Sequence, residues 1–333
     1  MAFQPWQLHR STSHRHRRPG RRQRVALGLV VVAGAIGLMI WWVTSRRGTG
    51  QEPVVLSATS SAQSSEAASA IADDFATAVC RAIQQDGRIT VTVHVALADK
   101  RRGGTPTKFG DGDKPEENLY WGARFGVETF LTQAGGWRRA YADDGDGGQI
   151  LRRVVLHRRT ESAPAWEARG VTRPFDVYVL ANAWRASAVT AAMAQPLRDA
   201  LGAKPVRLTV EGVDLEFGAG SVMSGYVGPN GMEDGYQDPF AELAAGPAGR
   251  QMGVFYVSAM SAVYLHRPVI DHGLYSVLFV RRAVVPEAYV LAGVLESLAA
   301  GELDEGFVEA AAAQYVSHQK NCTPQQARFL FYR

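Results

Sequence analysis

Two apolar stretches predict the centre of the fold. Residues 221–228 and 252–259 are short runs rich in valine and aromatic residues, and each ends in small residues. Runs of this length, bounded by turn residues, are typical of the inner strands of a parallel sheet. The same signs predict strands in residues 88–99, 150–160, 175–181 and 274–280. We therefore expect an α/β fold with a mainly parallel central sheet.

Apolar residues at helical spacing separate these strands. The pattern predicts helices over residues 66–86, 118–131, 186–201, 286–300 and 303–319. Residues 206–217 instead predict either one strand or a hairpin, whose tip would be at Glu211 and Gly212. Strands and helices alternate from Arg88 to Gln319, which predicts one domain of three layers, with helices on both faces of the sheet.

The N-terminal part of the chain has a different pattern. Residues 25–43 contain no charged residue, and a helix needs about 20 apolar residues to cross a bilayer core. Arginines are abundant before this run and fewer after it, which predicts a cytoplasmic N-terminus and an exported C-terminal domain. A cleaved signal peptide is the alternative, but its apolar region is usually shorter, and residues 43–45 provide no Ala-x-Ala cleavage site.

The chain therefore divides into segments with separate roles. We expect a basic cytoplasmic tail in residues 1–24, a transmembrane signal anchor in 25–43, a flexible tether in 44–65 and the α/β domain in 66–333. This predicts a single-pass protein of the inner (cell) membrane with a periplasmic or extracellular domain. The net charge of +4 owes much to the tail, so we expect no nucleic acid as a partner. For Cys80 and Cys322, a disulfide and two free thiols both fit the sequence.

The loops after the strands resemble those of a known peptidase fold. The turn Gly228-Pro229-Asn230-Gly231, the small residues of 257–261 and the approach to a long helix at 280–289 are similar to the caspase-like cysteine peptidases, particularly the bacterial ones. The resemblance covers roughly residues 88–319. It implies a three-layer α/β/α domain in which a histidine follows one central strand and a nucleophilic cysteine follows the next.

The two positions that the resemblance assigns to this dyad carry Pro229 and Ala259. Neither side chain can transfer a proton or attack a carbonyl, so the resemblance implies a catalytically inactive member, a pseudo-peptidase. We expect it to bind a peptide or protein partner, with no cofactor and no metal. The crevice that would hold the partner is formed by Asp99, Trp184, Pro229, Asn230 and Ser258.

An active hydrolase is the alternative. A shift of one position would make Ser258 the nucleophile, and Ser261 lies close to it in the sequence. A serine nucleophile needs a base within about 3 Å, and the nearby candidates are His266 and His272. Other site patterns are weak, because the sequence has no Gly-x-Ser-x-Gly motif, no P-loop and no Rossmann fingerprint. The acidic loops at residues 110–117 and 143–148 offer oxygen ligands but lack the EF-hand spacing for calcium.

Overall fold

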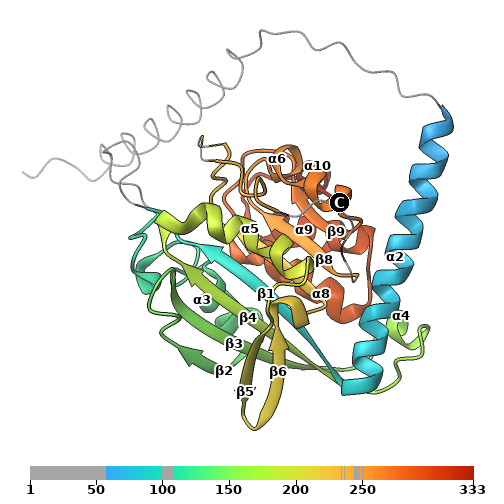
Figure 1. Ribbon diagram of the computed structural model, residues 1–333, viewed down its shortest axis with the longest axis horizontal. Helices are drawn as coiled ribbons and strands as arrows, with labels where there is room; N and C mark the ends of the chain where they lie inside the picture. The colour runs from blue at the N-terminus through green and yellow to red at the C-terminus, as the bar shows by residue number, and fades with distance from the viewer. Residues whose placement is uncertain (1–57, 100–108, 234, 236, 244–247, 249–250) are drawn as a thin grey trace, which may run out of the picture. The chain divides into compact units, whose positions relative to one another are not determined.

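The computed structural model describes residues 58–99, 109–233, 235, 237–243, 248 and 251–333 (Figure 1). The predicted tail, the predicted anchor in residues 25–43 and most of the predicted tether lie outside these residues. Within the described part of the chain, no helix is long and apolar enough to cross a membrane.

A mixed sheet of eight strands forms the centre of the domain, in the order β10-β9-β8-β7-β1-β4-β3-β2 (Figure 1). Its strands are β1 (Arg88–Ala96), β2 (Arg138–Asp143), β3 (Ile150–Thr160), β4 (Phe175–Trp184), β7 (Met223–Val227), β8 (Gly253–Val257), β9 (Tyr275–Val280) and β10 (Phe331–Tyr332). The neighbouring strands β9, β8, β7, β1 and β4 are parallel. The strands β10, β3 and β2 each run antiparallel to a neighbour. The carboxyl ends of the parallel strands therefore meet at one edge of the sheet.

Helices pack on both faces of this sheet, as the alternation predicts. Val91, Val93 and Val95 of β1 pack into one core with α2 (Ala58–Asp86), α3 (Val127–Gln133), α8 (Ala288–Ala300) and α9 (Glu305–His318). On the opposite face, Tyr226 and Tyr256 pack into a second core with α5 (Val189–Ala200), α6 (Ser261–Tyr264) and α7 (His266–Asp271). The hairpin of β5 (Val206–Val210) and β6 (Val213–Phe217) covers β3 and β4 on that second face. The sequence-based prediction of an α/β fold is confirmed.

Two helices begin far from their predicted starts. Helix α2 begins at Ala58, inside the predicted tether, where residues 58–65 include two alanines and neither glycine nor proline, the two residues least compatible with a helix. The helix predicted over residues 118–131 begins only at Val127. The side chain of Asn118 explains this delay, because it bonds to the backbone N and O of Ala98 and to Tyr120 N, which holds the segment in turns.

The C-terminus adds two elements that the sequence analysis did not predict. Thr323 and Gln326 form a capping box that starts α10 (Pro324–Leu330), and the strand β10 follows directly. Strand β10 pairs with β9 and closes one side of the sheet. These elements form one side of a pocket at the carboxyl edge.

Candidate functional site

The loops after β7 and β8 lie next to each other at the carboxyl edge of the sheet. The two strands are parallel neighbours, and Gly228 N donates to Val257 O over 3.3 Å. Further along, Asn230 Nδ2 donates to Ala259 O over 2.7 Å. Pro229 and Ala259 therefore occupy adjacent loops.

The two serines considered as nucleophiles are both fully buried. Ser261 Oγ donates to Tyr256 O and accepts from Val280 N, both at 2.8 Å. Its hydroxyl is therefore held between the backbones of β8 and β9. Ser258 Oγ has no hydrogen-bond partner within the described residues. Neither serine has the exposed, base-activated hydroxyl that attack on a carbonyl requires.

The two histidines considered as bases, His266 and His272, contact groups other than the hydroxyls of the two serines. The ring of His266 contacts Phe279 and Tyr332, with ring centroids 4.9 and 4.8 Å apart, and its Nε2 is buried. Burial lowers the pKa of His266, because the charged imidazolium loses hydration. His272 Nδ1 lies 2.7 Å from Pro268 O, one helical turn earlier. In the part of the chain that the structure describes, no histidine pairs with Ser258.

The different environments of the two serines lead to a stability prediction. We expect Ser261→Ala to lower the free energy of unfolding by about 1–3 kcal/mol, because it leaves a buried donor and acceptor of β8 and β9 unpaired. Ser258→Ala removes a buried hydroxyl without a partner, so we expect no loss of stability or a small gain. Urea denaturation of both variants and the wild type measures this difference. Equal losses in the two variants would contradict the hydrogen bonds described here.

Three of the five residues expected to line the crevice are buried. Trp184, Asn230 and Ser258 are 7%, 3% and 0% exposed. Asn230 Oδ1 also accepts from Met232 N over 3.1 Å, so its side chain shapes the loop. Asp99 is exposed and Pro229 is partly exposed. Direct contact with a partner is therefore limited for the three buried residues, and a role in binding for all five stays a prediction.

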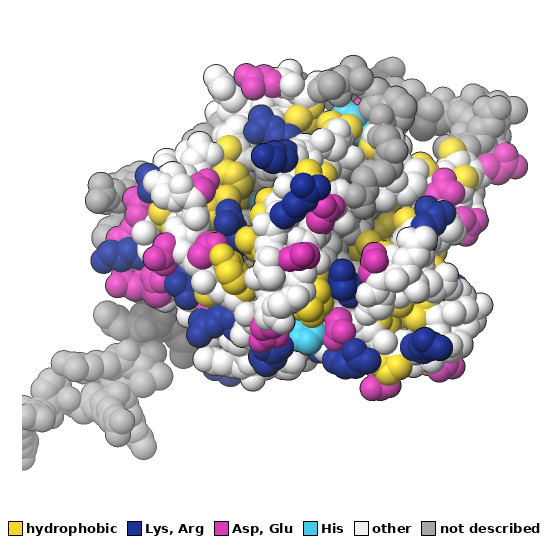
Figure 2. Space-filling model, turned by 60° about the horizontal axis from the view of Figure 1, so that its bottom comes forward, with side chains coloured by type: hydrophobic (Ala, Val, Ile, Leu, Met, Phe, Trp, Pro, Cys, Tyr) yellow, Lys and Arg dark blue, Asp and Glu magenta, His cyan; other side chains and the backbone are white. Residues whose placement is uncertain are grey.

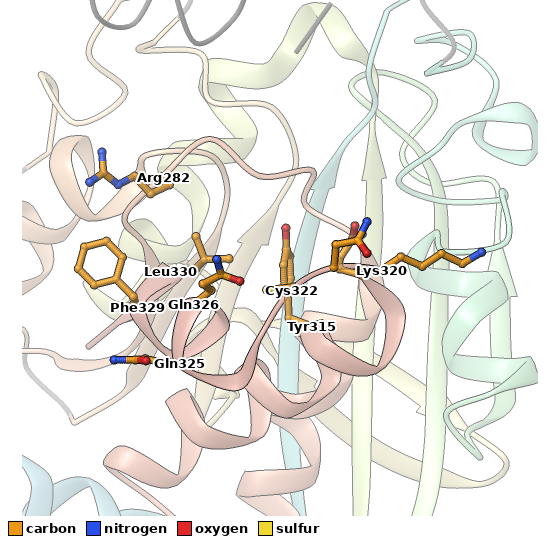
Figure 3. A pocket seen from close by; sticks show the side chains of 10 residues that line it. Arg282, Tyr315, Lys320, Cys322, Gln325, Gln326, Phe329 and Leu330 are labelled. Atoms are coloured by element: carbon orange, nitrogen blue, oxygen red, sulfur yellow. The ribbon is translucent and has the colours of Figure 1, made fainter. Parts of the chain in front are cut away.

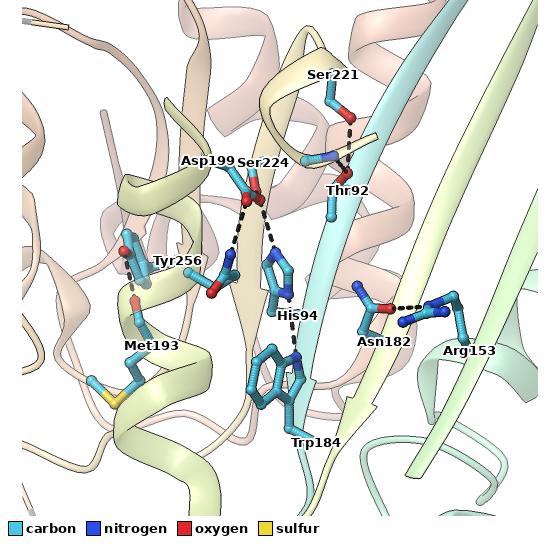
Figure 4. A network of polar contacts seen from close by, with 12 residues as sticks. Thr92, His94, Arg153, Asn182, Trp184, Met193, Asp199, Ser221, Ser224 and Tyr256 are labelled. Carbon is cyan, nitrogen blue, oxygen red and sulfur yellow. Dashed lines mark hydrogen bonds and ion pairs between the residues drawn. The ribbon is translucent and has the colours of Figure 1, made fainter. Parts of the chain in front are cut away.

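A buried polar network lies behind this edge and joins β1, β4, β7 and α5 (Figure 4). His94 Nε2 lies 3.0 Å from Asp199 Oδ2, and Ser224 Oγ donates to the same oxygen over 2.7 Å. Gln195 Nε2 donates to Asp199 Oδ1 over 3.0 Å, and Trp184 Nε1 donates to His94 Nδ1 over 3.2 Å. Because Nδ1 accepts a hydrogen bond, the ring carries a proton on Nε2 and donates it to the carboxylate.

The arrangement of this network indicates a structural role and does not match that of a nucleophilic catalytic site. In a Ser-His-Asp triad the histidine lies between the other two residues, whereas here Asp199 lies between Ser224 and His94. His94 and Asp199 are 4% and 2% exposed, so a substrate cannot reach them. The donors around Asp199 offset the loss of hydration of its charge. The network therefore fixes α5 to the sheet.

A pocket of about 600 Å³ opens beside the carboxyl edge, between the end of β9, the end of α9 and α10 (Figure 3). Residues that line it include Arg282, Tyr315, Lys320, Asn321, Gln325 and Phe329. Met260 N donates to Arg282 O over 3.1 Å, so the pocket adjoins the loop that carries Ala259. Cys322 also lines the pocket, and both it and Cys80 are free thiols. This pocket was not predicted, because its wall includes α10, which the apolar pattern does not reveal.

Charges are mixed on one face of the described surface. On the face shown in Figure 2, basic and acidic side chains alternate without forming a patch of one sign. Ion pairs such as Arg139 with Glu128 and Arg207 with Glu216 are examples of this mixing. The described residues contain no group of three or more histidine, cysteine or acidic side chains that could hold a metal ion.

Comparisons with known proteins give no family for this chain. No family model, no curated protein and no solved structure matches it.

Proposed function

We propose that this chain is a membrane-anchored, exported domain of caspase-like architecture that binds a peptide or protein partner without hydrolysing it. The anchor in this proposal is the uncharged segment of residues 25–43, and the arginine-rich tail before it favours export of the domain. The observation that carries the proposal is made at the carboxyl edge of the sheet, where Pro229 and Ala259 occupy adjacent loops. The nearby Ser258 is buried there, and no base among the described residues contacts its hydroxyl.

The arrangement of the strands supports the caspase-like part of the proposal. Strands β7 and β8 lie side by side within the parallel region, and each is followed by one of the two positions that the resemblance assigns to the dyad. Helices cover both faces of the sheet. In such open sheets, ligands bind outside the carboxyl ends of the strands.

The distribution of exposed apolar side chains supports binding at this edge. Of the six large apolar side chains that are exposed in the described part of the chain, five lie within residues 263–329. The most exposed are Val263 on α6 and Phe329 on α10, at 62% and 52%. Val263 lies on the helix that follows the Ala259 loop and Phe329 lines the pocket, so these two side chains adjoin the carboxyl edge, where exposed apolar groups can serve as contacts for a partner. Helix α6 begins just after Met260, which bonds to Arg282 at the pocket.

Site-specific crosslinking in cells tests this proposal. With benzoylphenylalanine placed at Val263 in the full-length chain, we expect one crosslinked adduct of defined mass, because this side chain lies at the proposed contact. The same group placed at Arg207, on the hairpin strand β5, is the control and should give none. The partner identified by mass spectrometry should form the same adduct when both proteins are purified.

Labelling by a serine-reactive fluorophosphonate distinguishes the alternative function. We expect no labelling of the wild-type chain, since neither Ser258 nor Ser261 has an accessible hydroxyl next to a base. Labelling that disappears in Ser258→Ala or in Ser261→Ala would establish a hydrolase and overturn the proposal. Adducts of equal yield at Val263 and at Arg207 would remove the support for binding at this edge.

A further inference from the structure

The pocket beside the carboxyl edge has positive charge on two sides. In Figure 3, Arg282 lies on one side of the pocket and Lys320 on the other, with the side chains of α10 between them. Arg281 adds a third cation, because its guanidinium lies 5.6 Å from the Phe329 ring, as does that of Arg282. The rim of the pocket therefore carries a cation at each end, both pointing outward in this view, and an aromatic ring lies near Arg282.

Nearby carboxylates bind other groups and leave these cations without an acidic partner. Glu305 and Glu309 pair with Arg328, on the same helix as Phe329. Asp304 pairs with Arg333 over 2.8 Å, and Glu287 accepts from Tyr289 and Gln319. Within the described residues, no acidic side chain forms an ion pair with Arg281, Arg282 or Lys320. Their charge is available to a negatively charged ligand.

The wall between the cations is fixed in shape and rich in amide groups. The capping box of Thr323 and Gln326 fixes the start of α10, and Gln319 is held by Glu287 and the Tyr289 hydroxyl. The side chains of Asn321 and Gln325 line the pocket as well. Amides of this kind can donate to and accept from the backbone of an extended peptide. Phe329 adds an apolar contact surface.

We propose that this pocket binds an acidic segment of the partner, an extended peptide in which carboxylates flank an apolar side chain. The carboxylates pair with Arg282 and Lys320, and the apolar side chain packs on Phe329. This inference rests on the proposed binding function and names the chemistry of the partner. The pocket volume of about 600 Å³ is within the range of ligand sites. Arg282 and Lys320 are both exposed, so the pocket is open to solvent, and it is the proposed binding function that favours a peptide over a lipid headgroup.

Fluorescence anisotropy with defined peptides tests this inference. The full-length chain is reconstituted in phosphatidylcholine nanodiscs and titrated against a fluorescein-labelled peptide of alternating glutamate and leucine. The control peptide has glutamine in place of glutamate. We expect the acidic peptide to bind roughly 10-fold more tightly than the control, because its carboxylates can pair with two cations that have no acidic partner among the described residues and the glutamine side chains cannot. Added salt should weaken the binding of the acidic peptide.

Charge-reversal variants locate the binding. We expect Arg282→Glu and Lys320→Glu each to weaken acidic-peptide binding by roughly 10-fold, and Phe329→Ala to weaken it several-fold without changing its salt dependence. Lys204→Glu, on an exposed loop before the hairpin, is the matched control and should leave the binding unchanged. Thermal unfolding of each variant shows whether the fold is preserved. Equal binding of the two peptides, or wild-type binding by Arg282→Glu, would overturn the inference.

Two further results separate this inference from its alternatives. If the charge reversals abolish sedimentation with phosphatidylglycerol vesicles but leave peptide binding intact, the pocket contacts lipid and the inference fails. If the crosslink at Val263 persists in Arg282→Glu at full yield, the partner binds the edge without this pocket. In that case the proposed binding function is retained, and the inference that the partner presents an acidic segment to this pocket fails. Fluorophosphonate labelling, in contrast, would overturn the proposed function itself.

Discussion

Replacing Asp199 with alanine is expected to lower the free energy of unfolding by about 3–5 kcal/mol. The change removes the acceptor shared by His94 and Ser224 and the one used by Gln195. His94 and Ser224 are buried between α5 and the sheet, where water cannot readily replace the lost carboxylate, whereas Gln195 is partly exposed. His94 cannot easily turn its donor elsewhere, because Trp184 holds its other ring nitrogen. Urea denaturation followed by tryptophan fluorescence measures the loss.

Two control variants define the cause of this loss. Asp199→Asn keeps the volume of the side chain but offers one acceptor oxygen in place of two, so we expect a smaller loss of about 1–3 kcal/mol. Asp271→Ala removes an exposed carboxylate that pairs with Arg267, and we expect a loss below about 1 kcal/mol. If Asp199→Ala were no more harmful than Asp271→Ala, the network would not hold α5 to the sheet.

The second large effect is expected at Trp166, on the short helix α4 (Pro164–Glu167). Its side chain is 0% exposed, and its indole nitrogen donates to Leu298 O of α8 over 3.0 Å. Gly301 follows α8 with a φ of 73°, and a Cβ there would lie 2.9 Å from the Trp166 ring. We expect Trp166→Ala to cost about 3–5 kcal/mol, because it leaves a cavity that such close packing cannot fill. The same denaturation experiment measures it.

Trp166→Phe serves as the matched control for this prediction. It keeps much of the apolar contact and loses the hydrogen bond to Leu298, so we expect a loss intermediate between those of wild type and Trp166→Ala. Both variants lie far in sequence from the carboxyl-edge loops, and we expect neither to create fluorophosphonate labelling. A loss below about 1 kcal/mol in Trp166→Ala would show that α4 contributes little to the core.

Much of the sheet could be predicted because its signals are local. Strands β7 and β8 are buried at every position, and their continuous apolar runs show this directly in the sequence. The hairpin is another case, since Glu211 and Gly212 both have positive φ, 52° and 83°, at the predicted tip. Two consecutive residues of this kind are typical of a tight hairpin turn.

The contacts at the site depend on distant parts of the chain and could not be predicted in the same way. His94 and Asp199 are 105 positions apart, and their spacing carries no motif. Trp184 and Asn230 are buried because other side chains cover the strand ends. The apolar pattern of the sequence does not specify which side chains do so. The capping box at Thr323 was visible in the sequence as a Thr-Pro-Gln-Gln run, a signal that could have revealed α10.

The long helix at the start of the domain changes how a partner would meet it. Helix α2 has 29 residues, which corresponds to about 43 Å of rigid length. Its second half packs on the sheet through Phe75, Val79 and Ile83, whereas Glu66 and Ser69 in its first half remain exposed. This first half is therefore a stiff rod rather than a random coil. A partner that contacts it would meet a preformed helical surface and would lose less conformational entropy on binding than it would with a flexible segment.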